Sequence, residues 1–231
     1  MKKKFQGNKK ISIGLSGATG RMGKAVKELV YKKNSGFSLV EEAPPLSGFE
    51  QWNKKKVQGV VDFSSPVLFD LALKWCLFNN RPLVSGTTAL SNKQKNNLKK
   101  AGKKIPVFYE ENMSWGIWQI KQWIRTLSVP NYDLLLEDIH HKDKKDKPSG
   151  TALKLEKQFP AVARKKLKVI SFRKGREFGT HRLIFKGPQE QVLLEHKALS
   201  RQLFAEGALK ALKWLIKKSP GLYSFEDMYR A

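Results

Sequence analysis

The sequence predicts an α/β protein with a parallel sheet covered by helices on both faces, followed by a smaller α+β part with a mixed sheet. In the first half, short apolar runs alternate with segments of helical periodicity, which is typical of a parallel sheet. In the second half the apolar runs show partial two-residue alternation, which favours an antiparallel or mixed sheet. A glycine-rich turn joins the first apolar run to the first helical segment, as in Rossmann-type folds.

Short apolar runs and helix-start signals define the elements of the first half. The first run ends at glycines, and the next segment has Val26 and Val30 at helical spacing. Ser65 provides an N-cap and Pro66 occupies the favoured first helical position. The predicted strands are Ile11–Ser16, Phe37–Val40, Val57–Phe63, Arg81–Ser85 and Ile105–Tyr109, and the predicted helices are Gly20–Lys33, Ser65–Asn79 and Ser91–Ala101.

The second half contains three helical segments and four apolar runs. Trp115, Trp118 and Trp123 lie in the first of these helices, and we interpret them as packing or subunit-contact residues. The predicted helices are Trp115–Ser128, Ser149–Gln158 and Phe204–Lys217, and the predicted strands are Asp133–Ile139, Leu167–Phe172, His181–Lys186 and Gln191–Lys197.

Size and composition indicate a globular protein in a reducing compartment. The 231 residues, 40% of them hydrophobic, suit one large domain or two small ones. The single cysteine, Cys76, excludes an internal disulfide framework and a cysteine-based metal site, and its apolar surroundings predict a buried thiol. No run has the length of a membrane span, and the apolar run after the lysine-rich start is too short for an export signal. We therefore expect a cytoplasmic protein without a membrane partner.

The chain is strongly basic, with 45 basic and 20 acidic residues and a net charge of +25. Such a surface attracts nucleic acids, membranes and small anions. The lysines are scattered along the chain, however, and no nucleic-acid-binding module is recognisable. We therefore expect no nucleic-acid partner.

The segment from His140 to Thr151 carries the clearest chemical signal. His140 and His141 offer imidazoles that exchange protons near neutral pH, and Lys144 follows closely. The following Pro-Ser-Gly-Thr sequence predicts a helix start, whose amides hold anions. A solvated charged loop is the alternative interpretation of such a charge run. Adjacent histidines on a strand point to opposite faces, and no carboxylate has helical metal-ligand spacing, so we expect no metal site.

The turn from Gly17 to Gly23 has the context of a pyrophosphate-binding loop, with a strand before it and a helix after it. A ribose-binding acid is expected about 20 residues further on, where Glu41 and Glu42 lie. No arginine follows closely to bind a 2′-phosphate, which slightly favours NADH over NADPH. Two further loops, 86–88 and 110–114, follow strands at the edge where open α/β sheets bind ligands.

Together these residues resemble the dihydrodipicolinate reductase family (4-hydroxy-tetrahydrodipicolinate reductases). The matching segments run in family order over nearly the whole chain, and the His-His segment is the most specific of them. They are GATGRMG at 17–23, VDFSSP at 61–66, SGTT at 85–88, ENMSWG at 111–116, HHKDKKDKPSGTA at 140–152, RKGREFGTH at 173–181, FKGPQE at 185–190, HKALSRQLFAEGALKALKWL at 196–215 and PGLYSFEDM at 220–228.

The resemblance implies a role for each matching residue. It implies His140 and Lys144 as proton donors or acceptors in catalysis. It implies substrate binding by His141, Ser149, Gly150 and Thr151, and cofactor binding by Gly17, Ala18, Thr19, Gly20, Arg21, Met22, Gly86, Thr87, Thr88, Glu110, Glu111, Asn112 and Met113, to which Glu41 is added as the candidate ribose acid.

The resemblance also implies an architecture and a reaction. A dinucleotide-binding domain would comprise residues 1–114 and 201–231, with an inserted substrate-binding and oligomerisation domain at 115–200. The reaction would be the NADH- or NADPH-dependent reduction of a small cyclic dicarboxylate in lysine biosynthesis, by a homotetramer. Three departures stand out: the segment between Val40 and Val57 is short, Asp143 replaces a basic or imidazole residue, and Glu110 and Glu111 replace small ones.

Two other functions remain as alternatives. A catalytically degenerate homologue that binds a nucleotide would be consistent with the short segment after the second strand. A basic nucleic-acid-binding protein on the same scaffold would explain the charge, but the intact histidine–lysine constellation argues against it.

Overall fold

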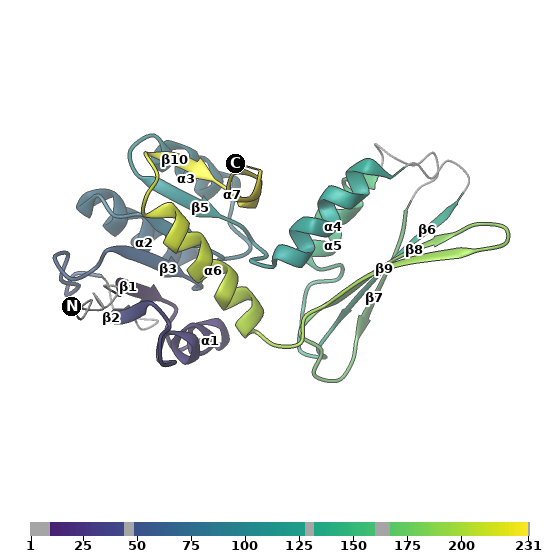
Figure 1. Ribbon diagram of the computed structural model, residues 1–231, viewed down its shortest axis with the longest axis horizontal. Helices are drawn as coiled ribbons and strands as arrows, with labels where there is room; N and C mark the ends of the chain where they lie inside the picture. Colours follow the sequence, from purple (N-terminus) through teal and green to yellow (C-terminus); the bar gives the residue numbers. More distant parts are fainter. Residues whose placement is uncertain (1–9, 44–48, 128–131, 160–166, 231) are drawn as a thin grey trace, which may run out of the picture. The chain divides into compact units, whose positions relative to one another are not determined.

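The computed structural model describes residues 10–43, 49–127, 132–159 and 167–230. The chain divides into two compact units (Figure 1): the first comprises Met1–Met113 and Phe204–Ala231, and the second Ser114–Leu203. Within the described ranges, no helix has the length and apolar character needed to cross a membrane.

The first unit contains a parallel sheet of six strands in the order β10-β5-β4-β3-β1-β2. Every pairing is parallel, as the alternation of strands and helices predicts. The strands are β1 (Ile11–Ser16), β2 (Phe37–Ala43), β3 (Gly59–Asp62), β4 (Leu83–Ser85), β5 (Pro106–Tyr109) and β10 (Gly221–Tyr223). The helices are α1 (Arg21–Val30), α2 (Pro66–Asn79), α3 (Asn92–Gly102), α6 (Gln202–Leu215) and α7 (Phe225–Tyr229).

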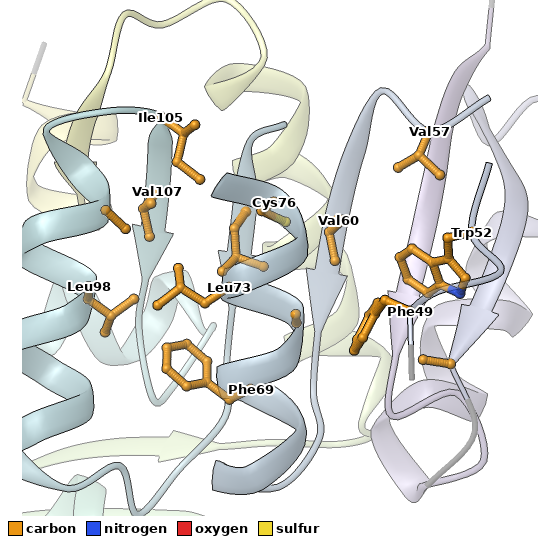
Figure 2. Close-up of a cluster of buried hydrophobic side chains, with 14 of the residues drawn as sticks. Phe49, Trp52, Val57, Val60, Phe69, Leu73, Cys76, Leu98, Ile105 and Val107 are labelled. Carbon is orange, nitrogen blue, oxygen red and sulfur yellow. The ribbon is translucent and has the colours of Figure 1, made fainter. Parts of the chain in front are cut away.

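Helices cover both faces of this sheet, with α1 and α6 on one side and α2 and α3 on the other (Figure 1). On the second side, Phe69 and Leu73 of α2 pack between Leu98 of α3 and the sheet (Figure 2). Burying an aliphatic or phenyl side chain of this size contributes roughly 1.5–3 kcal/mol. Cys76 is fully buried in the same cluster, which confirms the predicted structural thiol, and burial raises its pKa. The sheet is thereby fixed as a platform for the loops at its carboxyl edge.

The second unit contains a four-stranded mixed sheet in the order β7-β6-β8-β9. The β6–β7 pairing is parallel, and the β6–β8 and β8–β9 pairings are antiparallel, so the predicted mixed sheet is confirmed. Helices α4 and α5 pack on one face through a core that includes Ile124, Leu136 and Phe185. The elements are α4 (Trp115–Thr126), β6 (Asp133–His140), α5 (Gly150–Glu156), β7 (Lys168–Arg173), β8 (Thr180–Lys186) and β9 (Gln191–Lys197).

Some element limits differ from those predicted. β2 continues to Ala43 beside β1, three residues past the predicted end, because polar side chains are tolerated on an outer strand. The strand β10 and helix α7 were not predicted, because Pro220-Gly221 has the signature of a turn and both elements are short. The first predicted helix ends at Val30, and the last residue of the predicted helix Trp115–Ser128 lies outside the described residues.

His196 of β9 connects the second sheet to the start of α4. Its Nε2 lies 2.9 Å from Oγ of Ser114, the N-cap residue of α4. A Cβ added to Gly116 would lie 2.8 Å from the imidazole, so only glycine leaves room for the ring. Burial and the neighbouring His181 lower the pKa of His196 to about 4. The ring is therefore a neutral structural group.

This lowered pKa predicts a pH-dependent stability. Between the usual pKa of 6.5 and the folded value of about 4, the unfolded chain binds a proton that the folded chain does not, so stability falls as the pH falls. The thermal unfolding midpoint of wild type should therefore drop more between pH 7 and pH 5 than that of His196→Gln, by roughly 2–4 °C. Parallel pH curves for the two proteins would contradict this prediction.

Candidate active site

The predicted proton-transfer residues lie at the carboxyl end of β6, in the second unit. Positions alternate along the strand, so Asp138 and His140 lie on the same helix-covered face as the core residues Leu134 and Leu136. Asp138 is fully buried, and His140 is 8% exposed. Nδ1 of His140 lies 3.0 Å from Oδ1 of Asp138, so a buried carboxylate accompanies the first of the two histidines.

The Asp138 carboxylate receives donors from the neighbouring strands and from the start of α5. It accepts hydrogen bonds from the Ser149 amide at 2.8 Å and the Ser149 hydroxyl at 2.7 Å. The Arg173 guanidinium lies 3.1 Å away, and Nε2 of His181 lies 3.4 Å away. Burial alone would raise the pKa of this carboxyl, but the close contacts with His140 and His181 and the hydrogen bonds from Ser149 outweigh burial and lower the pKa below its usual range. The carboxylate is therefore ionised.

His181 completes the buried polar cluster from β8, where it pairs with Asp138. Burial lowers the pKa of His181, although the Asp138 carboxylate opposes this effect. Among the described residues, Asp138, His140 and His181 form the one group with a spacing that could hold a metal ion. The guanidinium of Arg173 already contacts the carboxylate there, and a second cation would be repelled.

Lys144 lies in the loop between β6 and α5. Its Nζ is 2.8 Å from Oδ1 of Asp146, and its amide donates to the His141 carbonyl. Burial raises the pKa of Asp146, but the Lys144 ammonium outweighs burial and lowers it. The amide of His141 donates to the Glu177 carbonyl, which joins this loop to the segment before β8. The loop is thus held by several contacts, although Lys142, Asp143, Lys145, Asp146 and Lys147 are exposed.

Ser149 is the N-cap residue of α5, as the Pro-Ser-Gly-Thr sequence predicts. Its hydroxyl accepts from the Ala152 amide and donates to Asp138. Gly150 and Thr151 form the first turn of the helix; Gly150 is exposed and Thr151 half-buried. The structure therefore brings His140, Lys144 and Ser149 into one network within the second unit.

In the first unit, the turn from Gly17 to Gly23 admits only glycine at two positions. Gly17 has φ +79°, and a Cβ added there would lie 2.3 Å from the Phe63 carbonyl oxygen. A Cβ at Gly23 would lie 2.2 Å from the Gly17 carbonyl oxygen. Gly20 is the N-cap residue of α1, and its amide donates to the Gly17 carbonyl. The backbone is thus tightly wound at the start of α1, where a phosphate group can approach the amides.

A cavity of about 380 Å³ lies at the carboxyl edge of the parallel sheet. It is lined by residues from the start of α1 and from the loops after β3, β4 and β5. The predicted residues that line it are Arg21, Met22, Gly86, Thr87, Thr88, Glu111, Asn112 and Met113, and the residues that were not predicted are Phe63, Ser64 and Phe204. The predicted residues that do not line it are Gly17, Ala18, Thr19, Gly20, Glu41 and Glu110.

Asp62, at the end of β3, holds two of the residues that line this cavity, Ser64 and Thr87. It is fully buried and accepts hydrogen bonds from the hydroxyls of Ser64, Ser85 and Thr87. Burial raises its pKa, because these neutral donors offset only part of the lost hydration. The Ser64 amide in turn donates to the Thr87 hydroxyl at 3.0 Å. The buried carboxyl therefore ties two cavity-lining loops together.

Three candidate glutamates of the first unit have protein partners. Oε1 of Glu111 accepts a hydrogen bond from the Tyr109 hydroxyl and lies 3.7 Å from the Lys95 ammonium. Glu41 accepts from the Asn53 amide at 3.0 Å, and Glu42 pairs with Lys27 at 3.0 Å. Both of the latter lie in β2 beside the end of β1, the edge where a ribose-binding acid was expected.

Asp138, Arg173 and Asp62 were missed by the sequence analysis. A signal existed for Asp138, since an acidic residue occupies an inward position of an otherwise apolar strand two residues before His140. Arg173 and Ser171 act from β7, more than 30 residues away, and only the sheet pairing reveals their proximity to Asp138. Asp62 ends an apolar run, which indicates the end of a buried strand but not its three hydroxyl partners.

Comparisons with known proteins agree with this arrangement. Residues 11–113 match the family model of the dihydrodipicolinate reductase N-terminus, and residues 118–229 match that of the C-terminus. A protein named 4-hydroxy-tetrahydrodipicolinate reductase from Bdellovibrio bacteriovorus is 40% identical over 225 residues, covering 95% of this chain and 96% of that protein. One of the same name from Buchnera aphidicola is 34% identical over 266 residues, covering 96% and 97%.

Among solved structures, a dipicolinate-bound dihydrodipicolinate reductase from Paenisporosarcina sp. TG-14 has the same fold. The TM-score is 0.73 at 18% sequence identity, with 93% of this chain and 97% of that chain covered. Both family models and near-full-length relatives match, and the chain therefore belongs to the dihydrodipicolinate reductase family.

Proposed function

We propose that this protein is an NAD(P)H-dependent 4-hydroxy-tetrahydrodipicolinate reductase, which forms tetrahydrodipicolinate in the diaminopimelate route of lysine biosynthesis. The observation that carries the proposal is the His140–Asp138 contact of 3.0 Å beside the Lys144 loop and the start of α5. Relatives that match nearly the whole chain bear the name of this reductase. The substrate is a small cyclic dicarboxylate.

The proposed chemistry assigns proton handling to two side chains. A bound reduced nicotinamide supplies the hydride. His140 accepts and releases its transferable proton at Nε2, since its Nδ1 faces the Asp138 carboxylate. Lys144 carries a second transferable proton at Nζ and is oriented by Asp146. We propose that His141, together with Ser149, Gly150 and Thr151 at the start of α5, binds the carboxylates of the substrate.

The residues of the first unit fit a dinucleotide. The turn from Gly17 to Gly23 leaves no space for a Cβ at either end, so the backbone amides can approach a pyrophosphate closely. We propose that 17–22, 86–88 and 110–113 hold the cofactor, and that NADH is slightly favoured because no arginine follows β2 closely. Glu41 remains the proposed ribose acid, although its carboxylate also accepts from the Asn53 amide.

These roles assign a function to each part of the chain. Residues 1–114 with 201–231 are the proposed dinucleotide-binding domain, and residues 115–200 the proposed substrate-binding and oligomerisation domain. The cytoplasm remains the predicted location, on the basis of the single cysteine.

We also propose that the protein forms a homotetramer through the second sheet. On the face opposite α4 and α5, Leu135, Ile184 and Leu193 form one row across β6, β8 and β9. Leu193 is 50% exposed, and Phe172 of the neighbouring β7 is 38% exposed. An exposed row of apolar side chains of this kind favours contact with another chain.

An absorbance assay with NADH and NADPH in parallel tests the proposed reaction. With substrate generated in situ from pyruvate and aspartate semialdehyde, wild type should oxidise one or both cofactors. Lys144→Ala and His140→Gln should each lower kcat by about 100-fold or more, because general acid–base groups contribute that much. The dissociation constant of the cofactor should change little.

Lys145→Ala is the matched control, because it removes an exposed lysine from the same loop. It should retain wild-type turnover. If a folded wild-type protein oxidises neither cofactor, the degenerate nucleotide-binding homologue becomes the better description. Near-normal turnover in both active-site variants would refute the roles of His140 and Lys144.

The glycine turn gives a second test. Gly17→Ala should raise the dissociation constant of NADH at least about tenfold, because a Cβ 2.3 Å from the Phe63 carbonyl forces the loop to move. Gly36→Ala is the control, since Gly36 has φ +77° but nothing within 4 Å of an added Cβ. Both variants carry the same backbone strain, so equal affinities measured by calorimetry would argue against a role for this turn in cofactor binding.

Analytical ultracentrifugation tests the proposed tetramer. Wild type should sediment as a species of four chains, and Leu193→Asp should dissociate it, because a buried carboxylate in an apolar interface is unfavourable. Phe78→Asp changes an apolar side chain that is 86% exposed on α2, and it should leave the assembly intact. A monomeric wild type would exclude the proposal.

A further inference from the structure

We propose that Asp138 is the positioning residue of the active site: together with Arg173, it fixes the imidazole of His140 and ties the Lys144 loop and the start of α5 to one buried point. The proposal rests on the proton-transfer roles assigned to His140 and Lys144 above. Asp138 itself is fully buried, and its role is exerted through its neighbours.

Both carboxylate oxygens of Asp138 are occupied by donors from different parts of the second unit. Oδ1 lies 3.0 Å from His140 Nδ1 and 3.4 Å from His181 Nε2, and it accepts from the Ser149 hydroxyl at 2.7 Å. Oδ2 accepts from the Ser149 amide at 2.8 Å, from Arg173 at 3.1 Å and from the Ser171 hydroxyl at 3.2 Å. One side chain thus joins β6, β7, β8 and the start of α5.

The contact on Oδ1 selects one tautomer of His140. An anion 3.0 Å from Nδ1 favours a proton on that nitrogen, which leaves Nε2 as the atom that exchanges protons. Gly179 lies against the opposite side of the ring, and a Cβ added there would be 3.1 Å from Nε2. Glycine at this position therefore keeps the exchanging nitrogen from being covered.

The contact on Oδ2 extends the network to Lys144. The Arg173 guanidinium also donates to the backbone carbonyls of Asp138 and Asp146. Asp146 in turn holds the Lys144 ammonium at 2.8 Å. A chain of contacts therefore runs from Asp138 through Arg173 and Asp146 to Lys144. The Asp138 carboxylate thus helps to hold both proton-transferring side chains, His140 and Lys144, in position.

The position of Asp138 in the strand supports a functional role. On the same face of β6, Leu134 and Leu136 pack into the hydrophobic core, where an apolar residue at 138 would also fit the pattern. A buried ion pair is often no more stabilising than an apolar replacement. Stability alone therefore does not explain a charged residue at position 138. Orientation of His140 and of the Lys144 loop does.

The tautomer of His140 can be measured in the wild-type protein. Long-range ¹H–¹⁵N correlation spectra at a pH where the imidazole is neutral should show a protonated Nδ1 and a bare Nε2. A ring protonated at Nε2 would overturn the proposal. This measurement needs no catalytic activity, so it separates failure of the positioning role from failure of the proposed reductase function.

The variant Asp138→Asn then tests the consequence for turnover. It should lower kcat about 100-fold or more, as loss of an oriented proton donor does, with mixed His140 tautomers and an unchanged NADH dissociation constant. Glu137→Gln is the matched control: Glu137 precedes Asp138 on the opposite face and pairs with Arg182 at 3.5 Å. Wild-type kcat and tautomer in Asp138→Asn would refute the proposal.

If Asp138→Asn does not fold, Arg173→Lys provides the second variant. Lysine keeps the charge beside Asp138 but cannot bridge to the Asp146 carbonyl as the guanidinium fork does. We expect kcat to fall at least about tenfold, with a smaller change in KM. Arg182→Lys is the control: Arg182 lies on the sheet face opposite α4 and α5, so both values should stay as in wild type. Equal kcat in Arg173→Lys and wild type would refute the bridging role of Arg173.

Discussion

A buried carboxylate that must be fully hydrogen-bonded is the constraint on which the second unit depends. Burying an unpaired carboxylate costs several kcal/mol, and the cost is offset only when donors reach both of its oxygens. At Asp138 those donors come from three strands and a helix start. Displacing any one of these segments would leave a charge unsatisfied, so chemistry at the site and packing of the sheet are linked.

The first unit meets the same constraint with different donors. Asp62 is equally buried, but its partners are three neutral hydroxyls and not a guanidinium, and its pKa is raised where that of Asp138 is lowered. Both carboxylates lie at the carboxyl ends of strands, where loops from several strands converge. In each unit one acidic side chain thus orders the loops that carry the proposed ligand-binding residues.

The sequence predicted the parallel sheet, the mixed sheet and the clustering of His140 and Lys144, because these follow from local periodicity and from a contiguous motif. It did not predict β10, whose glycine-led three residues carry no strand signal of their own. Nor did it reveal the contacts of Asp138 with Ser171 and Arg173, since these depend on the register between β6 and β7. The domain boundaries and the roles of the individual site residues remain predictions.

The pairing of the second sheet sets Ser171, Asp138, His181 and His196 side by side on β7, β6, β8 and β9. This row of polar side chains across the sheet also favours the native register of the strands over shifted ones. A slip of β8 by one residue would place Thr180 or Arg182 opposite Asp138 and turn His181 toward the other face. A misregistered sheet would therefore bury a poorly solvated charge, and the same side chains that are proposed to serve the reaction discriminate against that alternative structure.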